Sequence, residues 1–364
     1  MKNFIVDLRG FDYNYFGGVR RFAYDLPIVL NKKYNVLLIV NSKSFKDILI
    51  SEGVSEESIF LDKRTLKKRN YVLFLFTAID YLIKTYVFTQ YYFRIFRKDS
   101  YQFIEGDICY VPTSTINYYS RIPKYIVSPH DLQHEVYPEN FSKIVRIYRF
   151  SQYRLSLYIS SKIQLSSITI KDEFINLIPD IANKIVILNE FYTDKKYNID
   201  YNLIDKQILN LFYPAQFWEH KNHDQLFSIL SKLPMKFKLH LTGNDFGKIK
   251  NYSHYEFLEY HGVVSEQKLI SLYKLCDFTV LPTKYESSSL PMIESIGLGT
   301  PVIYNNIDVL REIGDTLPNC FPFDFKNGSV NELEELLLNL QFSDSKIPEK
   351  FEINHVAHKL FNLF

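Results

Sequence analysis

The sequence has few cysteines and almost no excess of one charge. Only Cys109, Cys276 and Cys320 occur among 364 residues, and their spacing fits neither a metal site nor a disulfide framework. The 43 basic and 41 acidic residues leave a net charge of +2, which does not indicate a nucleic-acid partner. No signal peptide is visible, because residues 4–8 already look like a strand. We therefore expect a cytoplasmic protein in a reducing environment.

Two motifs of other protein classes are also missing. There is no G-x-G-x-x-G sequence, which argues against a nicotinamide-type dinucleotide fold. The longest uncharged run in the most aromatic region covers residues 70–79, far short of the roughly 20 residues that a transmembrane helix needs. The length favours two domains. Alternating strand and helix patterns predict doubly wound parallel sheets.

Residues 276–304 carry the clearest signal. A short β-branched segment, residues 276–283, is followed by a loop with Glu286, by serines suited to cap a helix, by Pro291 at its first turn, and by Glu294 inside it. The predicted helix N-terminus favours a phosphate, and each flanking carboxylate can accept hydrogen bonds from sugar hydroxyls. This order suits a sugar–diphosphate–nucleoside. Two solvated carboxylates on a surface helix are the simpler alternative.

The motif resembles the signature of retaining glycosyltransferases of family 4, which have the GT-B fold. The resemblance rests on two glutamates eight residues apart, on the Leu290-Pro291 pair between them, and on the Gly-Thr-Pro-Val sequence of residues 299–302. It implies that Glu286 holds the donor sugar and that Glu294 binds the ribose. The diphosphate would bind at the turn of Ser289, Leu290 and Pro291, to the backbone N–H groups of the first two residues and of those that follow the proline.

Further positions match the family elsewhere in the chain. The pair Gly17-Gly18 follows the first predicted strand, where the family has glycines beside the donor phosphates and the acceptor. His130 follows another predicted strand, and the resemblance implies that it contacts the donor sugar. Lys221 would stabilise the departing diphosphate. The Gly-Val turn at Val263 would line the nucleobase pocket.

The chain departs from the family at two of these positions. Gln216 stands where the family has a phosphate-binding arginine, which predicts weaker stabilisation of the leaving diphosphate. Ser289 stands where the family has glycine. No metal is expected, because His220 and His223 lack partners at ligand spacing. No cofactor besides the nucleotide-sugar donor is expected either.

The predicted fold is therefore α/β of the GT-B type, with two Rossmann-like domains facing a cleft. The first covers residues 1–195, with a C-terminal helix at 350–364 returning to it, and the second covers 206–345. The predicted function is retaining transfer of a hexose, with mannose or rhamnose as the guess, to a saccharide or lipid-linked glycan in surface polysaccharide biosynthesis. A non-catalytic nucleotide-sugar-binding or anchoring subunit and a sugar-nucleotide epimerase are the alternatives.

Residues 63–98 form a basic and aromatic region, with nine basic residues and the single acid Asp80. Such composition suits an amphipathic helix on an anionic membrane surface. A core helix with snorkelling lysines is the alternative. The candidate membrane-surface residues are Lys67, Lys68, Arg69, Arg94 and Arg97.

Overall fold

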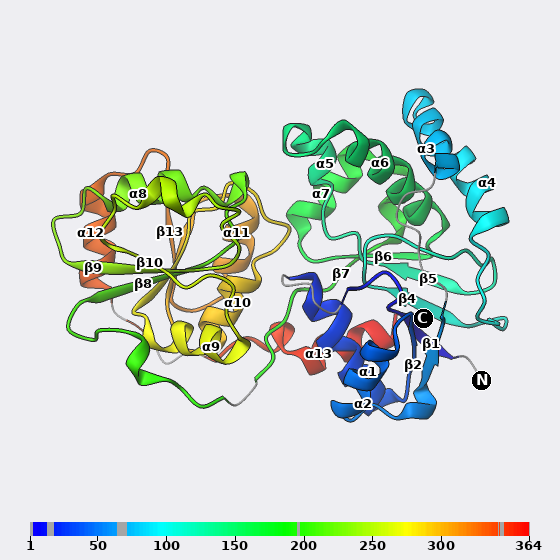
Figure 1. Ribbon diagram of the computed structural model, residues 1–364, viewed down its shortest axis with the longest axis horizontal. Coiled ribbons are helices and arrows are strands. Elements are labelled where there is room, and N and C mark those ends of the chain that lie inside the picture. The colour runs from blue at the N-terminus through cyan, green and yellow to red at the C-terminus, as the bar shows by residue number, and fades with distance from the viewer. Residues whose placement is uncertain are drawn as a thin grey trace. The chain divides into compact units, whose positions relative to one another are not determined.

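A computed structural model describes residues 3–12, 18–63, 71–194, 197–340, 342 and 346–363. The chain divides into unit 1, residues 1–189 with 353–364, and unit 2, residues 190–352. Each unit is built around its own parallel sheet (Figure 1). The predicted doubly wound architecture is confirmed.

The sheet of unit 1 has seven strands in the order β3-β2-β1-β4-β5-β6-β7. Helices α1 and α2 lie on one face and α6 and α7 on the other (Figure 1). The strands are β1 (Phe4–Asp7), β2 (Leu37–Val40), β3 (Ile59–Leu61), β4 (Ile108–Val111), β5 (Lys124–Val127), β6 (Lys162–Leu165) and β7 (Ile185–Ile187). The helices are α1 (Leu26–Tyr34), α2 (Lys43–Ser51), α3 (Tyr71–Ile83), α4 (Val87–Phe96), α5 (Gln133–Val136), α6 (Lys143–Ile159), α7 (Ile168–Leu177) and α13 (Ile353–Phe361).

The sheet of unit 2 repeats this topology with six strands, in the order β10-β9-β8-β11-β12-β13. Helix α8 lies on one face, and α9 and α10 lie on the other (Figure 1). The strands are β8 (Leu209–Pro214), β9 (Phe237–Thr242), β10 (Leu258–Tyr260), β11 (Phe278–Leu281), β12 (Val302–Asn305) and β13 (Cys320–Phe323). The helices are α8 (His223–Leu230), α9 (Glu266–Leu275), α10 (Leu290–Gly297), α11 (Asp308–Gly314) and α12 (Val330–Asn339).

Both sheets reverse their strand order at a switch point, between β1 and β4 in unit 1 and between β8 and β11 in unit 2. Ligands of open α/β sheets bind outside the carboxyl ends of the strands at such points. The loops that follow these four strands are therefore the places to look for a site.

Two element boundaries are set by local signals. Strand β6 ends at Leu165, because the Ser167 side chain accepts a hydrogen bond from the Ile170 N–H and starts α7 at Ile168. Helix α1 ends at Tyr34. Asn35 adopts a left-handed conformation (φ 52°) that stops the helix there.

Candidate functional site

The loops after β8 and β11 are tied together by hydrogen bonds in unit 2. The Thr283 hydroxyl donates to the His220 carbonyl at 3.0 Å, and the Lys284 N–H donates to the same oxygen at 2.8 Å. The Asn222 side-chain amide donates to the Pro282 carbonyl at 3.0 Å. The two loops thus hold each other at the switch point of the sheet.

Lys221 and Glu286 form an ion pair at this place. The Lys221 Nζ lies 2.5 Å from Glu286 Oε1, and the side chains are 15% and 17% exposed. Lys221 ends a single 3₁₀ turn (Glu219–Lys221), whose last carbonyl accepts a hydrogen bond from the Tyr213 hydroxyl at 2.6 Å. The fold therefore brings together the two side chains that were expected to act on the sugar and the leaving diphosphate.

Helix α10 starts next to this pair. Ser289 is its N-cap and accepts a hydrogen bond from the Met292 N–H at 3.4 Å, with Pro291 in the first turn. Glu294 lies inside the helix, is buried, and accepts a hydrogen bond from the Tyr273 hydroxyl at 3.4 Å. The structure thus places a helix N-terminus, which favours anions, in sequence between two carboxylates.

A third carboxylate, Glu190, lies in the same cluster and was missed in the sequence. Its side chain is buried, and Glu286, Glu294 and Lys221 all act on its charge. Burial, and then the two neighbouring glutamates, raise the pKa of Glu190 to about 8. Glu190 is therefore mostly protonated at neutral pH.

The remaining donor-side candidates that the structure describes, Gln216 and Val263, lie in the loops after β8 and β10 of unit 2. Gln216 follows β8 and is partly buried, whereas Val263 is largely exposed after β10. Gly243 passes so close to this loop that a Cβ atom on it would lie 2.9 Å from the Gln216 nitrogen, and its φ of +113° also favours glycine. The close approach of Gly243 fixes the backbone at Gln216.

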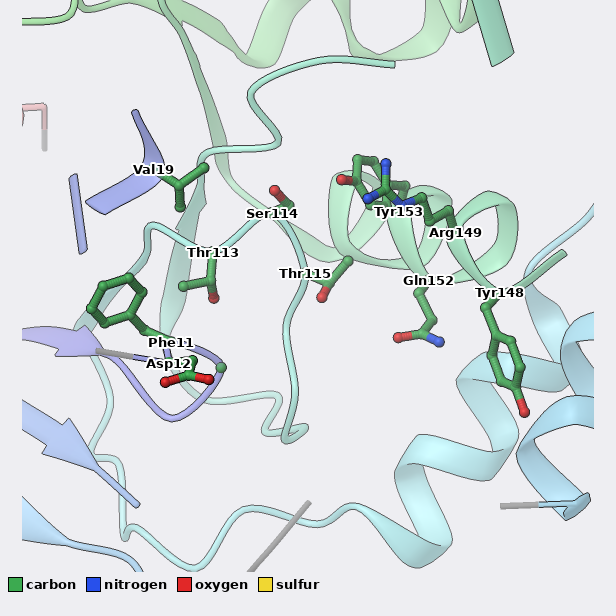
Figure 2. Close-up of a pocket in the computed structure, with 11 residues that line it drawn as sticks. Phe11, Asp12, Val19, Thr113, Ser114, Thr115, Tyr148, Arg149, Gln152 and Tyr153 are labelled. Atoms are coloured by element: carbon green, nitrogen blue, oxygen red, sulfur yellow. The ribbon is translucent and has the colours of Figure 1, made fainter. Parts of the chain in front are cut away.

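Unit 1 contains a cavity of about 510 Å³ at its own switch point (Figure 2). One wall comes from the loop after β1 and another from the loop after β4, while α6 supplies the rest. The lining side chains combine aromatic rings, hydroxyls and charged groups: Phe11, Asp12, Val19, Thr113, Ser114, Thr115, Tyr148, Arg149, Gln152 and Tyr153. Gly18 lies just before Val19, whereas Gly17 falls outside the described residues.

His130 follows β5 and has a left-handed backbone (φ 63°). Its Nε2 lies 2.8 Å from the Pro112 carbonyl oxygen, directly before the cavity residue Thr113. Because a carbonyl only accepts, Nε2 carries a proton there. Burial lowers the pKa of His130, so the ring is neutral and its Nδ1 is an acceptor.

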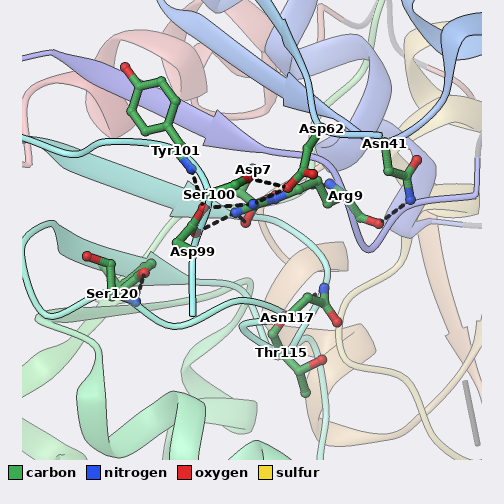
Figure 3. A network of polar contacts seen from close by, with 11 residues as sticks. Asp7, Arg9, Asn41, Asp62, Asp99, Ser100, Tyr101, Thr115, Asn117 and Ser120 are labelled. Atoms are coloured by element: carbon green, nitrogen blue, oxygen red, sulfur yellow. Dashed lines mark hydrogen bonds and ion pairs between the residues drawn. The ribbon is translucent and has the colours of Figure 1, made fainter. Parts of the chain in front are cut away.

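A buried charge network supports the loop between β1 and this cavity (Figure 3). The Arg9 guanidinium donates to Asp7, Asp62 and Asp99 at 2.7–2.9 Å and is fully buried. The Asn41 side chain donates to the Arg9 carbonyl at 2.7 Å. Arg9 directly precedes Gly10, the first residue of the cavity wall, so the network fixes the position where this wall begins.

Among the described residues, one group of side chains has ligand atoms close enough together to hold a metal ion. It consists of His240, Glu259 and His261, whose ligand atoms lie within 4.8 Å of one another. His240 Nδ1 lies 3.0 Å from His261 Nε2, and His240 Nε2 lies 2.9 Å from Asn210 Oδ1. These are hydrogen-bond distances, and the group shares no residue with the Lys221–Glu286 cluster. The expectation that transfer needs no metal stays a prediction.

Helices α3 and α4 of unit 1 carry much exposed apolar surface. Asp80 is buried and accepts hydrogen bonds from the Phe88 and Thr89 N–H groups, so the single acid of this region caps α4. Exposed apolar side chains include Tyr71, Leu75, Leu82, Ile83, Val87, Tyr91, Ile95 and Phe96. Arg94 is exposed and Arg97 partly so, whereas Lys67, Lys68 and Arg69 lie outside the described residues. None of the described helices is long and apolar enough to cross a bilayer.

Comparison with known proteins agrees with this architecture. Sucrose-phosphate synthase from Thermosynechococcus elongatus superposes with a TM-score of 0.65 at 12% identity, covering 100% of this chain and 98% of that one. HepE from Anabaena, in complex with UDP-glucose, gives 0.61 at 12% identity over 99% and 98%. The glycosyltransferase WaaG, involved in lipopolysaccharide biosynthesis, gives 0.60 at 15% identity over 99% and 95%. The fold is GT-B, as predicted.

Sequence comparison finds a relative and a matching protein family. A protein in the cps region of Klebsiella pneumoniae is 22% identical over 139 residues, which span 38% of this chain and only 39% of that protein. The family described as "Glycosyl transferases group 1" matches residues 194–351, which cover nearly all of unit 2 and include Lys221, Glu286 and Glu294. The match to the group 1 glycosyltransferases therefore lies entirely within unit 2.

Proposed function

We propose that the chain is a retaining glycosyltransferase of family 4, which transfers a hexose from a nucleotide-diphosphate sugar to a hydroxyl of a glycan. The observation that carries this proposal is the Lys221–Glu286 pair beside the N-terminus of α10, within the glycosyltransferase domain. A diphosphate needs positive charge and free N–H groups, and a sugar that develops positive charge needs a carboxylate. The cluster supplies these groups side by side.

Each residue has a defined part in this proposal. Lys221 and the amides at the start of α10 neutralise the departing diphosphate, while Glu286 holds hydroxyls of the donor sugar and favours positive charge at its ring. Glu294 binds the ribose, and the neutral His130 accepts a hydrogen bond from a sugar hydroxyl through Nδ1. The donor phosphate itself takes the proton of the acceptor hydroxyl. No metal takes part.

The acceptor is held by the cavity of unit 1. Aromatic rings such as Tyr148 and Tyr153 offer faces to a sugar ring, and Thr113, Thr115 and Gln152 offer hydrogen bonds to its hydroxyls. The cps-region relative and the lipopolysaccharide enzyme WaaG support a surface polysaccharide as the product. The proposed acceptor is therefore a growing capsule or lipopolysaccharide glycan.

A nucleotide panel tests the donor site. We expect UDP, GDP or dTDP, but not CMP, to raise the melting temperature of the protein, because only a diphosphate reaches the N-terminus of α10. At one hundred times its Kd, a ligand adds about 2.7 kcal/mol to the free energy of unfolding. Glu294→Ala should remove most of this shift, whereas Glu256→Gln, at an exposed carboxylate of the same unit, should keep it. The absence of a shift with every diphosphate would argue for a non-catalytic subunit.

We also propose that α3 and α4 rest on an anionic membrane surface and bring the enzyme to a lipid-linked acceptor. Exposed apolar side chains such as Leu82 and Ile83 occur in the same segment as the exposed cation Arg94. This combination of an apolar face with basic side chains suits the headgroup region of a bilayer. The membrane would be the inner face of the plasma membrane.

Vesicle sedimentation tests this surface. The protein should bind vesicles that contain phosphatidylglycerol and fail to bind pure phosphatidylcholine vesicles. A basic residue near an anionic surface contributes about 1 kcal/mol, so Arg94→Gln should weaken binding about fivefold. Leu82→Asp should weaken it further, whereas Leu338→Asp, at another exposed leucine, in α12, should not. Equal binding by Leu82→Asp and the wild type would exclude this surface.

A further inference from the structure

Glu190 is the most unusual group of the donor cluster. It is only 7% exposed, and its Oε2 has no hydrogen-bond partner among the residues that the structure describes. The backbone N–H of Leu290, the first residue of α10, acts on the Glu190 carboxyl as a hydrogen-bond donor. The carboxyl therefore lies at the helix N-terminus, where the proposed function puts a phosphate.

The charges around Glu190 do not balance. Among the residues that the structure describes, two carboxylates, Glu286 and Glu294, and one cation, Lys221, act on the charge of Glu190, and Lys221 is already paired with Glu286. Glu294 accepts a hydrogen bond from the Tyr273 hydroxyl, which carries no charge. An ionised Glu190 would add a further negative charge at the N-terminus of α10, where the proposed function places a diphosphate. Repulsion between these like charges would oppose donor binding.

A protonated Glu190 changes this balance. A neutral carboxyl group is a hydrogen-bond donor as well as an acceptor, and Oε2 has no partner in the described structure to receive or supply a proton. A phosphate oxygen at the start of α10 would be a strong acceptor for such a proton. The unpartnered Oε2 atom of a protonated Glu190 and a phosphate oxygen thus have complementary hydrogen-bonding properties.

We propose that Glu190 is a donor-binding residue that works uncharged. Its O–H group donates a hydrogen bond to a phosphate oxygen of the nucleoside diphosphate at the N-terminus of α10. When it loses its proton, the carboxylate takes the place of the phosphate at the Leu290 N–H and opposes the donor. This inference rests on the proposed function, and it adds a residue and a pH dependence to the donor site.

The direction of the pH dependence follows from the pKa of about 8. Below pH 7 the carboxyl is protonated and donor binding is at its strongest. One unit above the pKa only about a tenth of the molecules keep the proton, so the donor Kd should be about tenfold higher at pH 9 than at pH 7. Glutamine keeps the shape and the hydrogen-bond donor but cannot ionise.

Calorimetric titration of wild type and Glu190→Gln between pH 6.5 and 9 tests the inference, with the diphosphate selected by the nucleotide panel. We expect similar affinities at pH 6.5 and a Kd that rises about tenfold more in the wild type than in Glu190→Gln. Glu256→Gln should follow the wild type. Because the wild type and Glu190→Gln are compared at the same pH, the effect of the nucleotide's own titration on the Kd is the same for both and cancels in their ratio.

Two results would overturn the inference while leaving the proposed function intact. One is an identical pH profile in both proteins, and the other is a severe loss of affinity in Glu190→Gln at pH 6.5, which would mean that a charged carboxylate is needed. If no diphosphate binds either protein at any pH, the proposed function fails and the inference fails with it.

Thermal unfolding without nucleotide gives a second measurement. Between the ordinary carboxyl pKa of 4.5 and about 8, the unfolded chain has lost the Glu190 proton while the folded protein keeps it. The wild type should therefore lose stability as the pH rises through this window, and Glu190→Gln should lose less. Parallel melting curves of the two proteins across this window would contradict a neutral Glu190.

Discussion

Replacing Glu286 with glutamine should lower kcat/KM for sugar transfer by about a hundredfold to a thousandfold. This is the loss typical of removing one preorganised group that stabilises transition-state charge. Glutamine keeps the size of the side chain but cannot favour positive charge at the sugar ring. It also leaves Lys221 without its ionic partner, because the Lys221 Nζ lies 2.5 Å from Glu286 Oε1. The measurement is the initial rate of transfer with the donor identified by the nucleotide panel.

The structure provides controls for this experiment. Glu256→Gln removes an exposed carboxylate from the same unit and should keep the wild-type rate. Lys221→Met should also impair transfer, and the double variant should lose less than the two single losses combined, because the side chains act as a pair. A folded Glu286→Gln protein with the wild-type rate would refute the proposed role of Glu286.

The donor motif could be predicted because its signals are local. Ser289, Pro291 and Glu294 lie within six residues, and the rules for starting a helix placed α10 to within one residue of its observed start. The ion pair between Lys221 and Glu286 joins residues 65 positions apart. The sequence placed both residues at the donor site through the family resemblance but did not predict their ion pair, which forms because they lie in the loops after the neighbouring parallel strands β8 and β11.

Glu190 could not be predicted in this way. It follows a short strand and lies near the end of the first predicted domain, where a glutamate is normally solvated. The groups that act on its carboxyl, Glu286, Glu294 and the Leu290 N–H, lie roughly one hundred residues later in the chain. Neither periodicity nor spacing reports such a contact.

The Arg9 network was missed for the same reason. Its acids come from residues 7, 62 and 99, and each looks unremarkable in its own segment. Only the order of the strands brings them together, because β1 lies between β2 and β4. No local pattern in the sequence indicates that Arg9 is fully buried.

Replacing Arg9 with methionine should destabilise unit 1 by about 3–5 kcal/mol, the usual cost of removing one partner from a buried charge cluster. The guanidinium is fully buried and also lies over the Tyr118 ring, 4.4 Å from its centroid. Burial alone would lower its pKa, but Asp7 and Asp99 outweigh burial and raise it, so Arg9 stays charged. Methionine fills much of the volume but leaves Asp7, Asp62 and Asp99 without their shared cation.

The single tryptophan makes it possible to distinguish the unfolding of unit 1 from that of unit 2. Trp218 belongs to unit 2, so its fluorescence follows the unfolding of that unit, whereas far-ultraviolet circular dichroism follows both. In urea, Arg9→Met should shift part of the dichroism transition to lower concentration and leave the fluorescence transition nearly in place. Lys46→Met, which breaks the ion pair with the exposed Glu56 in the same unit, should move neither. If Arg9→Met and Lys46→Met unfolded alike, the three carboxylates would not depend on Arg9, and the loop before the cavity would need another anchor.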